Sequence, residues 1–210
     1  MSTSTEHVMH HDAPEAVGRR ERLGVRLIIV ADGSFVFALI FSYFYLRNLN
    51  VAGGWFPKDA HLFTVRSGWL LALPFVVAAI SHRIGQRNRA NLGTYSIITF
   101  LALAIGLVMQ WNQLSHMPFM LAEEGGFEGS YASMAFLMGA ANILHYVLGA
   151  FVALGLVIRT RRAALDPVLD TWRLLTAGSW FTWIAIAGIA GAITTSFVAC
   201  LLYTSDAADE

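Results

Sequence analysis

The sequence predicts an all-α, polytopic membrane protein of five transmembrane helices, with its N-terminus in the cytoplasm. The first observation is the composition, because 56% of the 210 residues are hydrophobic and 13% are charged, whereas a soluble domain carries about 25% charged residues. The second is that the apolar residues form windows long enough to cross about 30 Å of hydrocarbon. The third is the lack of strand-like alternation, which leaves the helix as the element that satisfies the backbone in lipid.

The first three predicted spans lie in the N-terminal part of the chain. The first covers residues 25–46 and contains one carboxylate, Asp32. The second covers residues 65–83, and Pro74 is expected to bend it because proline interrupts the hydrogen-bond ladder of a helix. The third covers residues 92–113. Each window is about 20 residues long, which is what a helix needs to cross the membrane.

The last two predicted spans differ from the others in length and in packing pattern. The fourth covers residues 131–158 and is long enough to tilt or to project from the bilayer. The fifth covers residues 174–198 and contains small residues four apart, including Ala187 with Gly191 and Gly188 with Ala192. Small residues at this spacing let helices approach closely, so the fifth span is expected to pack tightly against its neighbours.

Arginines gather in the connections at one end of the predicted spans. Eleven of the 14 Lys and Arg residues precede the first span or lie in the second-to-third and fourth-to-fifth connections. Cytoplasmic loops carry such an excess, so this end, with the N-terminus, is predicted to be cytoplasmic. Residues 1–22 lack the apolar segment of a signal peptide and are predicted to form a disordered cytoplasmic tail, followed by a transmembrane domain over residues 23–199. The eleven arginines are Arg19, Arg20, Arg22, Arg26, Arg83, Arg87, Arg89, Arg159, Arg161, Arg162 and Arg173.

Several classes of function are excluded by composition and motif. The 14 basic residues balance the 14 acidic ones, so the chain has no electrostatic signature of a nucleic-acid-binding protein. The single cysteine, Cys200, excludes a disulfide scaffold and a multi-cysteine metal site. Neither a phosphate-binding glycine loop nor a nucleophile with its base is present. His10 and His11 are expected to be incidental to the tail, so no catalytic residue and no bound metal are predicted.

Polar side chains inside the predicted spans are the candidate functional residues. Asp32 lies about two turns inside the first span, where a carboxylate is costly and indicates a proton relay, an ion site or a polar partner on another helix. The alternative is a protonated, hydrogen-bonded Asp32 that determines helix packing. Asn142 and His145 share one face of the fourth span, where they can form interhelical hydrogen bonds. Gln110 and Gln113 are expected to reach the outer interface.

Five segments, in order, resemble subunit III of the haem-copper oxidases. Residues 31–47 (ADGSFVFALIFSYFYLR) resemble its first shared helix, which has a Ser-Glu start and a Tyr-Phe-Tyr-Leu-Arg end. The other segments resemble its Trp-Pro loop, the end of the next helix but one, the Tyr-Gly-Ser start of the long helix, and its Gly-Phe-His-Gly-Leu-His segment. They are residues 53–57 (GGWFP), 110–119 (QWNQLSHMPF), 131–133 (YAS) and 140–145 (AANILH). The resemblance covers residues 23–198 and implies the short bacterial form of five helices.

The chain also departs from the family pattern at four places. Asp32 replaces a glutamate, Asn142 replaces the first histidine of a pair, and Gln113 stands where a glutamate is usual. The fifth span keeps Trp180 but lacks the Tyr-Trp-His-Phe-Val-Asp signature. These departures indicate a divergent branch of the family.

The resemblance implies a non-catalytic accessory subunit in a bacterial inner membrane. Such a subunit binds no cofactor itself; the haem and copper belong to the catalytic subunit I, against which it packs together with other oxidase subunits. It holds phospholipid in a cleft between helix groups and supports sustained, proton-coupled electron transfer to oxygen. Carried over to this chain, lipid-binding or interhelical polar roles fall to Asp32, Asn142, His145 and Trp180. Asp32 is expected to hydrogen-bond a polar group of the fourth span because the two lie at similar depth.

Three other functions share some of these sequence features. An accessory protein of a nitric oxide reductase would have the same features. A small helical transporter is suggested by Asp32, although the internal repeat common in transporters is not found. A dihaem cytochrome needs a second deep histidine beside His145, and neither His82 nor His116 lies at the required depth.

The C-terminal segment has a different character from the rest of the chain. Residues 200–210 (CLLYTSDAADE) resemble the translation of a transposase sequencing adapter. They are expected to be read-through from a gene fragment cut near the end of the fifth span, the alternative being a genuine short polar C-terminus.

Overall fold

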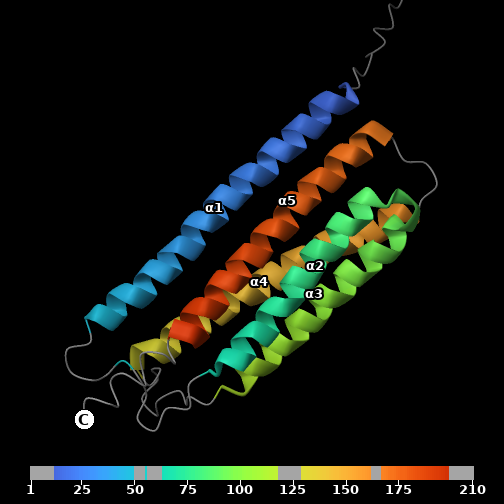
Figure 1. Ribbon diagram of the computed structural model, residues 1–210. Coiled ribbons are helices and arrows are strands. Elements are labelled where there is room, and N and C mark those ends of the chain that lie inside the picture. Colours follow the sequence, from blue (N-terminus) through green and yellow to red (C-terminus); the bar gives the residue numbers. More distant parts are fainter. Residues whose placement is uncertain (1–11, 50–54, 56–62, 118–128, 162–166, 199–210) are drawn as a thin grey trace, which may run out of the picture.

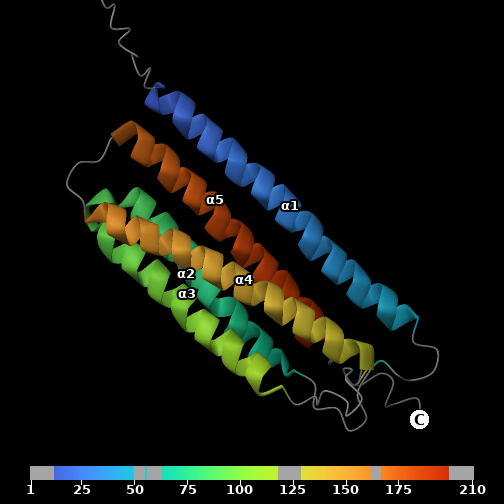
Figure 2. The same ribbon diagram turned by 180° about the vertical axis from the view of Figure 1, so that it is seen from behind.

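The computed structural model is a bundle of five long helices that run up and down in turn (Figures 1 and 2). It describes residues 12–49, 55, 63–117, 129–161 and 167–198. Each long helix is sufficiently long and apolar to cross a membrane, which confirms the prediction of an all-α, multi-pass membrane protein. The elements are α1 (Pro14–Asn48), α2 (Val65–Arg87), the short 3-10 helix η1 (Arg89–Asn91), α3 (Leu92–Ser115), α4 (Gly129–Thr160), α5 (Pro167–Ala192) and the π-helical turn η2 (Ile193–Val198).

The first helix begins earlier than predicted. α1 starts at Pro14, so the prediction of a disordered tail over residues 1–22 is wrong for residues 14–22. Proline suits the first position of a helix because its missing N–H would have no partner there. His10 and His11, like the predicted read-through at residues 200–210, lie outside the described residues.

The extra length of α1 is stabilised by a matching extension of α5, which starts at Pro167 instead of residue 174. The buried Gly18 of α1 lies against the Trp172 indole, where a Cβ atom would come within 2.3 Å of the ring. Near it, the Arg173 guanidinium donates to both carboxylate oxygens of Glu21 at 3.1–3.2 Å. The two extensions therefore support one another beyond the apolar windows.

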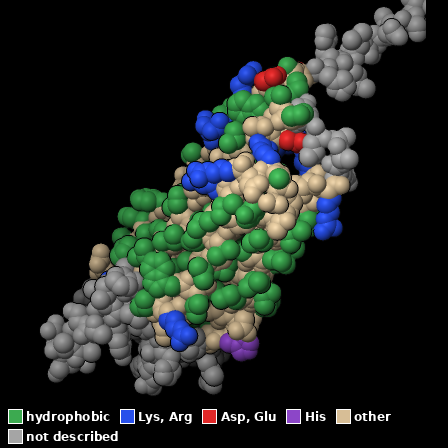
Figure 3. Space-filling view, turned by 45° about the vertical axis from the view of Figure 1, so that its right-hand side comes forward, with side chains coloured by type: hydrophobic (Ala, Val, Ile, Leu, Met, Phe, Trp, Pro, Cys, Tyr) green, Lys and Arg blue, Asp and Glu red, His purple; other side chains and the backbone are tan. Residues whose placement is uncertain are grey.

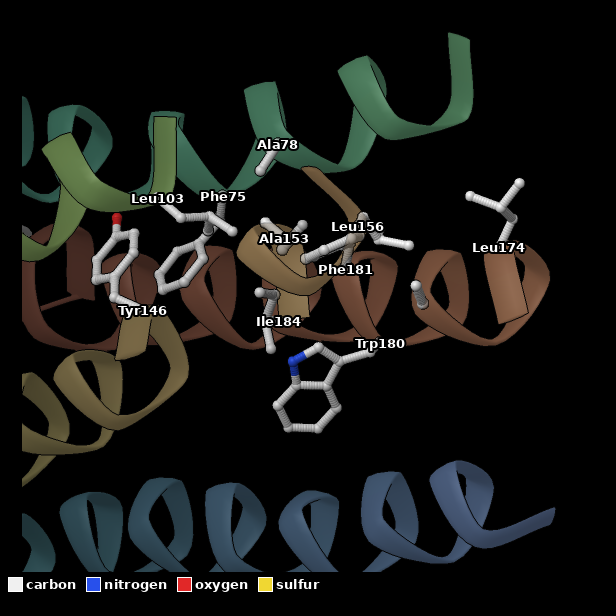
Figure 4. Close-up of a cluster of buried hydrophobic side chains, with 12 residues drawn as sticks. Phe75, Ala78, Leu103, Tyr146, Ala153, Leu156, Leu174, Trp180, Phe181 and Ile184 are labelled. Carbon is white, nitrogen blue, oxygen red and sulfur yellow. The ribbon is translucent and has the colours of Figure 1, made fainter. Parts of the chain in front are cut away.

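The helices α2, α3 and α4 form one group, and α1 packs mainly against α5, with a smaller contact to α4. α3 packs between α2 and α4, and α5 lies between this group and α1 (Figures 1 and 2). A core of apolar side chains joins the four helices α2, α3, α4 and α5 (Figure 4). At its centre the Phe75 and Tyr146 rings stack with centroids 3.8 Å apart, close to Gly106 on α3, where a Cβ would meet Tyr146 at 2.2 Å. Pro74 lies inside α2, which continues through it.

A second apolar cluster attaches α1 to α4 at the opposite end from the Glu21–Arg173 pair. Tyr43 of α1 is fully buried and packs edge-on against Trp55, with ring centroids 5.1 Å apart, and against Tyr131 of α4. Between these two attachments α1 is largely exposed to its surroundings. The surface carries an apolar belt along the helices, and blue arginine side chains gather at the end where α1 and α5 begin (Figure 3).

Candidate functional site

The central polar contact of the bundle joins α1 to α4 and α5 through Asp32. Nε2 of His145 lies 2.9 Å from Oδ2 of Asp32, and the Trp183 indole N–H donates to the same oxygen at 2.5 Å. The His145 side chain is 2% exposed and the Asp32 side chain 14%. We call these three residues the α1 tether. The expected hydrogen bond between Asp32 and a polar group of the fourth span is therefore present, and it occurs inside the bundle.

Aromatic rings hold the His145 imidazole in place. Phe75 of α2 and Trp180 of α5 contact it edge-on, with ring centroids 6.5 Å and 6.3 Å away. With Nε2 directed at Asp32, the remaining ring nitrogen, Nδ1, is buried and has no hydrogen-bond partner among the described residues. A buried polar atom without a partner is costly, so Nδ1 is a site where a small molecule such as water could form a hydrogen bond.

Asn142, one turn from His145 on α4, belongs to a different polar group. Its side-chain amide donates to Oε1 of Gln110 at 3.3 Å, and Gln110 in turn donates to Oε1 of Gln113 at 2.8 Å. Gln110 is 1% exposed, so the expectation that it reaches the outer interface is wrong. The burial follows from its position on the face of α3 that packs against α4, where an amide needs a partner.

Trp180 lines a cleft that separates α1 from α4, with α5 as its floor. The cleft has a volume of about 340 Å³, and Figure 4 shows the Trp180 indole directed from α5 toward α1. The walls are mostly apolar, while Glu21, Arg159 and Arg173 lie at one end. Arg159 is paired with Asp170 at 2.5 Å. The lining residues are Glu21, Val25, Ile28, Leu148, Phe151, Val152, Gly155, Leu156, Arg159, Arg173, Thr176, Ala177 and Trp180.

The structure therefore distributes the four predicted site residues over three neighbouring places. Asp32 and His145 form the tether, Trp180 contacts His145 and lines the cleft, and Asn142 joins the amide group with Gln110 of α3. Trp183 is a member of the tether that sequence reasoning missed. The position of Trp183 in the middle of the fifth span was a usable signal. Tryptophan in membrane helices concentrates at the interfaces, so a tryptophan in mid-span is expected to have a hydrogen-bond partner for its N–H.

Among the residues that the structure describes, His82 is the other buried histidine, and it lies in a different part of the bundle. Its Nε2 lies 3.0 Å from the carbonyl oxygen of Leu174, and the Gln86 amide is 3.1 Å away. It thus links α2 to the start of α5. Within the described residues, no three histidine, cysteine or carboxylate side chains are grouped closely enough to hold a metal ion.

The chain was compared with protein-family models and with curated proteins. No protein-family model matches the chain, and no curated protein is significantly similar to it. The tether and the cleft are therefore interpreted from their own chemistry. A carboxylate that accepts two hydrogen bonds is suited to hold a helix against the bundle, and an apolar cleft with arginines at one end is suited to hold an amphipathic molecule.

Proposed function

We propose that the chain is a non-catalytic accessory subunit of a respiratory haem-copper oxidase and resembles subunit III of that family. In this proposal it resides in a bacterial inner membrane with its arginine-rich end in the cytoplasm. It packs against the catalytic subunit, which holds the haem and copper. The five sequence segments that resemble the family support the proposal, and so does the observation that carries it: an apolar cleft between α1 and α4, next to the polar tether.

The shape and charge of the cleft fit a phospholipid. Its volume of about 340 Å³ lies at the lower end of the range of ordinary ligand pockets, about 300–1,000 Å³. Phe151 and Ile28 offer apolar walls for an acyl chain. Arg159 and Arg173, which are paired with Asp170 and Glu21, lie at the end where a headgroup phosphate would sit. Basic residues at the cytoplasmic ends of membrane helices attract anionic headgroups. The bound lipid would fill the space that α1 leaves and hold the subunit in its active arrangement.

The outward face of α1 supports contact with a partner helix. Phe37, Phe41 and Tyr45 recur at four-residue spacing, and neighbouring rings stack with centroids 6.5 Å and 5.9 Å apart. These side chains are 53–68% exposed. Aromatic rings are enriched where proteins meet, so this aromatic ladder is the surface that we assign to the catalytic subunit.

The first experiment isolates the full chain, with an affinity tag, from the membranes of its own host in a mild detergent. A subunit of an oxidase brings a haem protein with it, so we expect a haem absorption spectrum and oxygen consumption in the purified material. A chain that purifies alone, without any haem protein, contradicts the proposal and favours a small transporter.

The second experiment tests the lipid with one matched pair of variants. Gly155 lines the cleft, and a Cβ there meets no atom within 4 Å, so Gly155→Leu adds a side chain to the cleft wall from a position where the first carbon has room. Gly24 on α1 is equally open but does not line the cleft, so Gly24→Leu is the control. We expect Gly155→Leu to lower the phospholipid retained, measured by mass spectrometry, and to shorten the period of sustained turnover. Equal lipid content in both variants would contradict a lipid in this cleft.

A further inference from the structure

Three neighbouring hollows follow one another in space from the arginine-poor end of the bundle to His145. The outer groove, of about 500 Å³, is lined at that end by Thr64, Asn112, Gln113 and His116 among others. A cavity of about 20 Å³, the amide cavity, comes next and shares Gln113 with the groove. A second cavity of about 20 Å³, the histidine cavity, shares Asn142 with the amide cavity and reaches His145.

The amide cavity has the polarity and the size for water. Side-chain amides line one side of it, and the π-helical turn η2 contributes Thr195 and Ser196 on another. About 10–15 Å³ of this kind of volume holds one water molecule, and polar cavities hold water where apolar ones stay dry. Each of the two small cavities therefore has room for one water. The amides of Asn142, Gln110 and Gln113, joined by hydrogen bonds, mark a polar route from the groove inward.

The histidine cavity brings this route to the α1 tether. His145 lines it, and the Nδ1 atom of this imidazole is buried and has no partner among the described residues. The other nitrogen of the ring faces Asp32. Most of the lining of the histidine cavity is apolar, and its polar side chains are Asn142 and His145, so a water in this cavity would hydrogen-bond to these two and connect the amide cavity to the tether.

Toward the arginine-rich end, His145 is followed along α4 by apolar side chains of the core. Beyond His145, α4 continues with the fully buried Ala153, which belongs to the core cluster together with Phe181 and Ile184. The cleft lined by Trp180 opens on that side, whereas the outer groove is the hollow that connects, through shared lining residues, to the two small cavities.

We propose that water fills the two small cavities and connects the Asp32–His145 pair to the aqueous phase at the arginine-poor end of the bundle. Among the described residues that line the three hollows, the ionisable side chains are His145 and, in the groove, His116. Asp32 faces His145 from α1, while α2 and α5 present aromatic side chains to it. This inference does not depend on the proposed oxidase partner.

Gly191 offers a way to block the route without disturbing the fold. It lines both small cavities, and a Cβ at this position meets nothing closer than the Asn142 amide at 3.9 Å. Gly191→Ala therefore places a methyl group in the junction of the cavities. Asn142→Leu is a second block, because it replaces the shared amide with an apolar side chain of similar size. Gly24→Ala, in open space on α1, is the control.

The test measures the transfer of magnetisation from water to histidine rings by solid-state NMR of the full chain, labelled on histidine and alanine, in lipid bilayers. We expect the His145 ring to receive magnetisation from water in the parent chain and in Gly24→Ala. In Gly191→Ala and Asn142→Leu we expect a severalfold slower transfer to His145 and an unchanged transfer to His82, which lines none of the three hollows.

Two results would overturn the proposal. One is a transfer to His145 in the parent chain no faster than that to the methyl group of Ala153 in the dry core. The other is an unchanged transfer to His145 in both blocking variants. The first result is read from the parent chain alone, so it stands even if a variant fails to fold.

Discussion

Replacing His145 with leucine is the sharpest test of the α1 tether. Leucine fills a similar volume between Phe75 and Trp180, so the packing around the ring is largely kept. What is lost is the nitrogen that lies 2.9 Å from Oδ2 of Asp32. The carboxylate then stays inside the bundle with the Trp183 N–H as its remaining tether partner.

The expected cost follows from burial and charge. A hydrogen bond to a charged group contributes about 1.5–3 kcal/mol in water-soluble proteins, and interhelical polar contacts measured in a membrane protein contribute about 0.6 kcal/mol on average and at most about 1.7 kcal/mol. The Asp32 side chain is 14% exposed, so water replaces the lost partner poorly. We expect His145→Leu to lower the free energy of unfolding by about 2–3 kcal/mol, since a carboxylate without its partner in a membrane helix adds to the loss.

A double-mutant cycle separates the contact from the other effects of each substitution. The variants are His145→Leu, Asp32→Leu and the two combined, and unfolding is followed by circular dichroism as SDS is added to mixed micelles. Asp32→Leu leaves the Trp183 N–H without its acceptor in both the single and the double variant, so that effect cancels. We expect a coupling energy of about 1–2 kcal/mol; additive costs, within about 0.5 kcal/mol, would refute the tether.

Three further substitutions test other contacts by thermal unfolding in detergent. Gly106→Ala should destabilise the chain by about 1–3 kcal/mol through overpacking, because the added methyl lies 2.2 Å from the Tyr146 ring; an unchanged Tm would contradict this packing. Trp183→Phe removes the indole donor at 2.5 Å and should cost about 1 kcal/mol, whereas no loss would mean that this bond is dispensable. Glu21→Gln should cost about 1 kcal/mol or less, because the Glu21 and Arg173 side chains are 34% and 33% exposed. A larger loss would mean that this pair contributes more to stability than a partly exposed ion pair does.

The number and type of the elements could be predicted from sequence because the membrane imposes a local rule. A backbone in lipid must satisfy its own hydrogen bonds, so each apolar window becomes a helix wherever its neighbours lie. The predicted ends were less accurate. α1 and α5 begin at Pro14 and Pro167, ahead of their apolar windows, because the Glu21–Arg173 pair and the Gly18–Trp172 contact stabilise polar turns that hydropathy alone does not identify.

The candidate site could be predicted only in part. Asp32, Asn142 and His145 stood out because each is polar within an apolar window, and their depth indicated that Asp32 meets the fourth span. Depth does not specify which face of a helix is turned toward which neighbour. The choice of His145 over Asn142 as the partner, the burial of Gln110 and the role of Trp183 all depend on that rotation.

By itself, then, the sequence determined five membrane helices, the end at which the arginines gather, and a short set of polar residues that lipid does not tolerate unpaired. Only the tertiary structure decided how these residues pair and where space remains. Such pairing depends on contacts between residues more than a hundred positions apart, as between Asp32 and His145, and the cleft and cavities depend on how far α1 stands from the other helices. The physical reason is that hydrogen bonding within a helix is local, whereas packing between helices is set by the shapes of all the side chains at once.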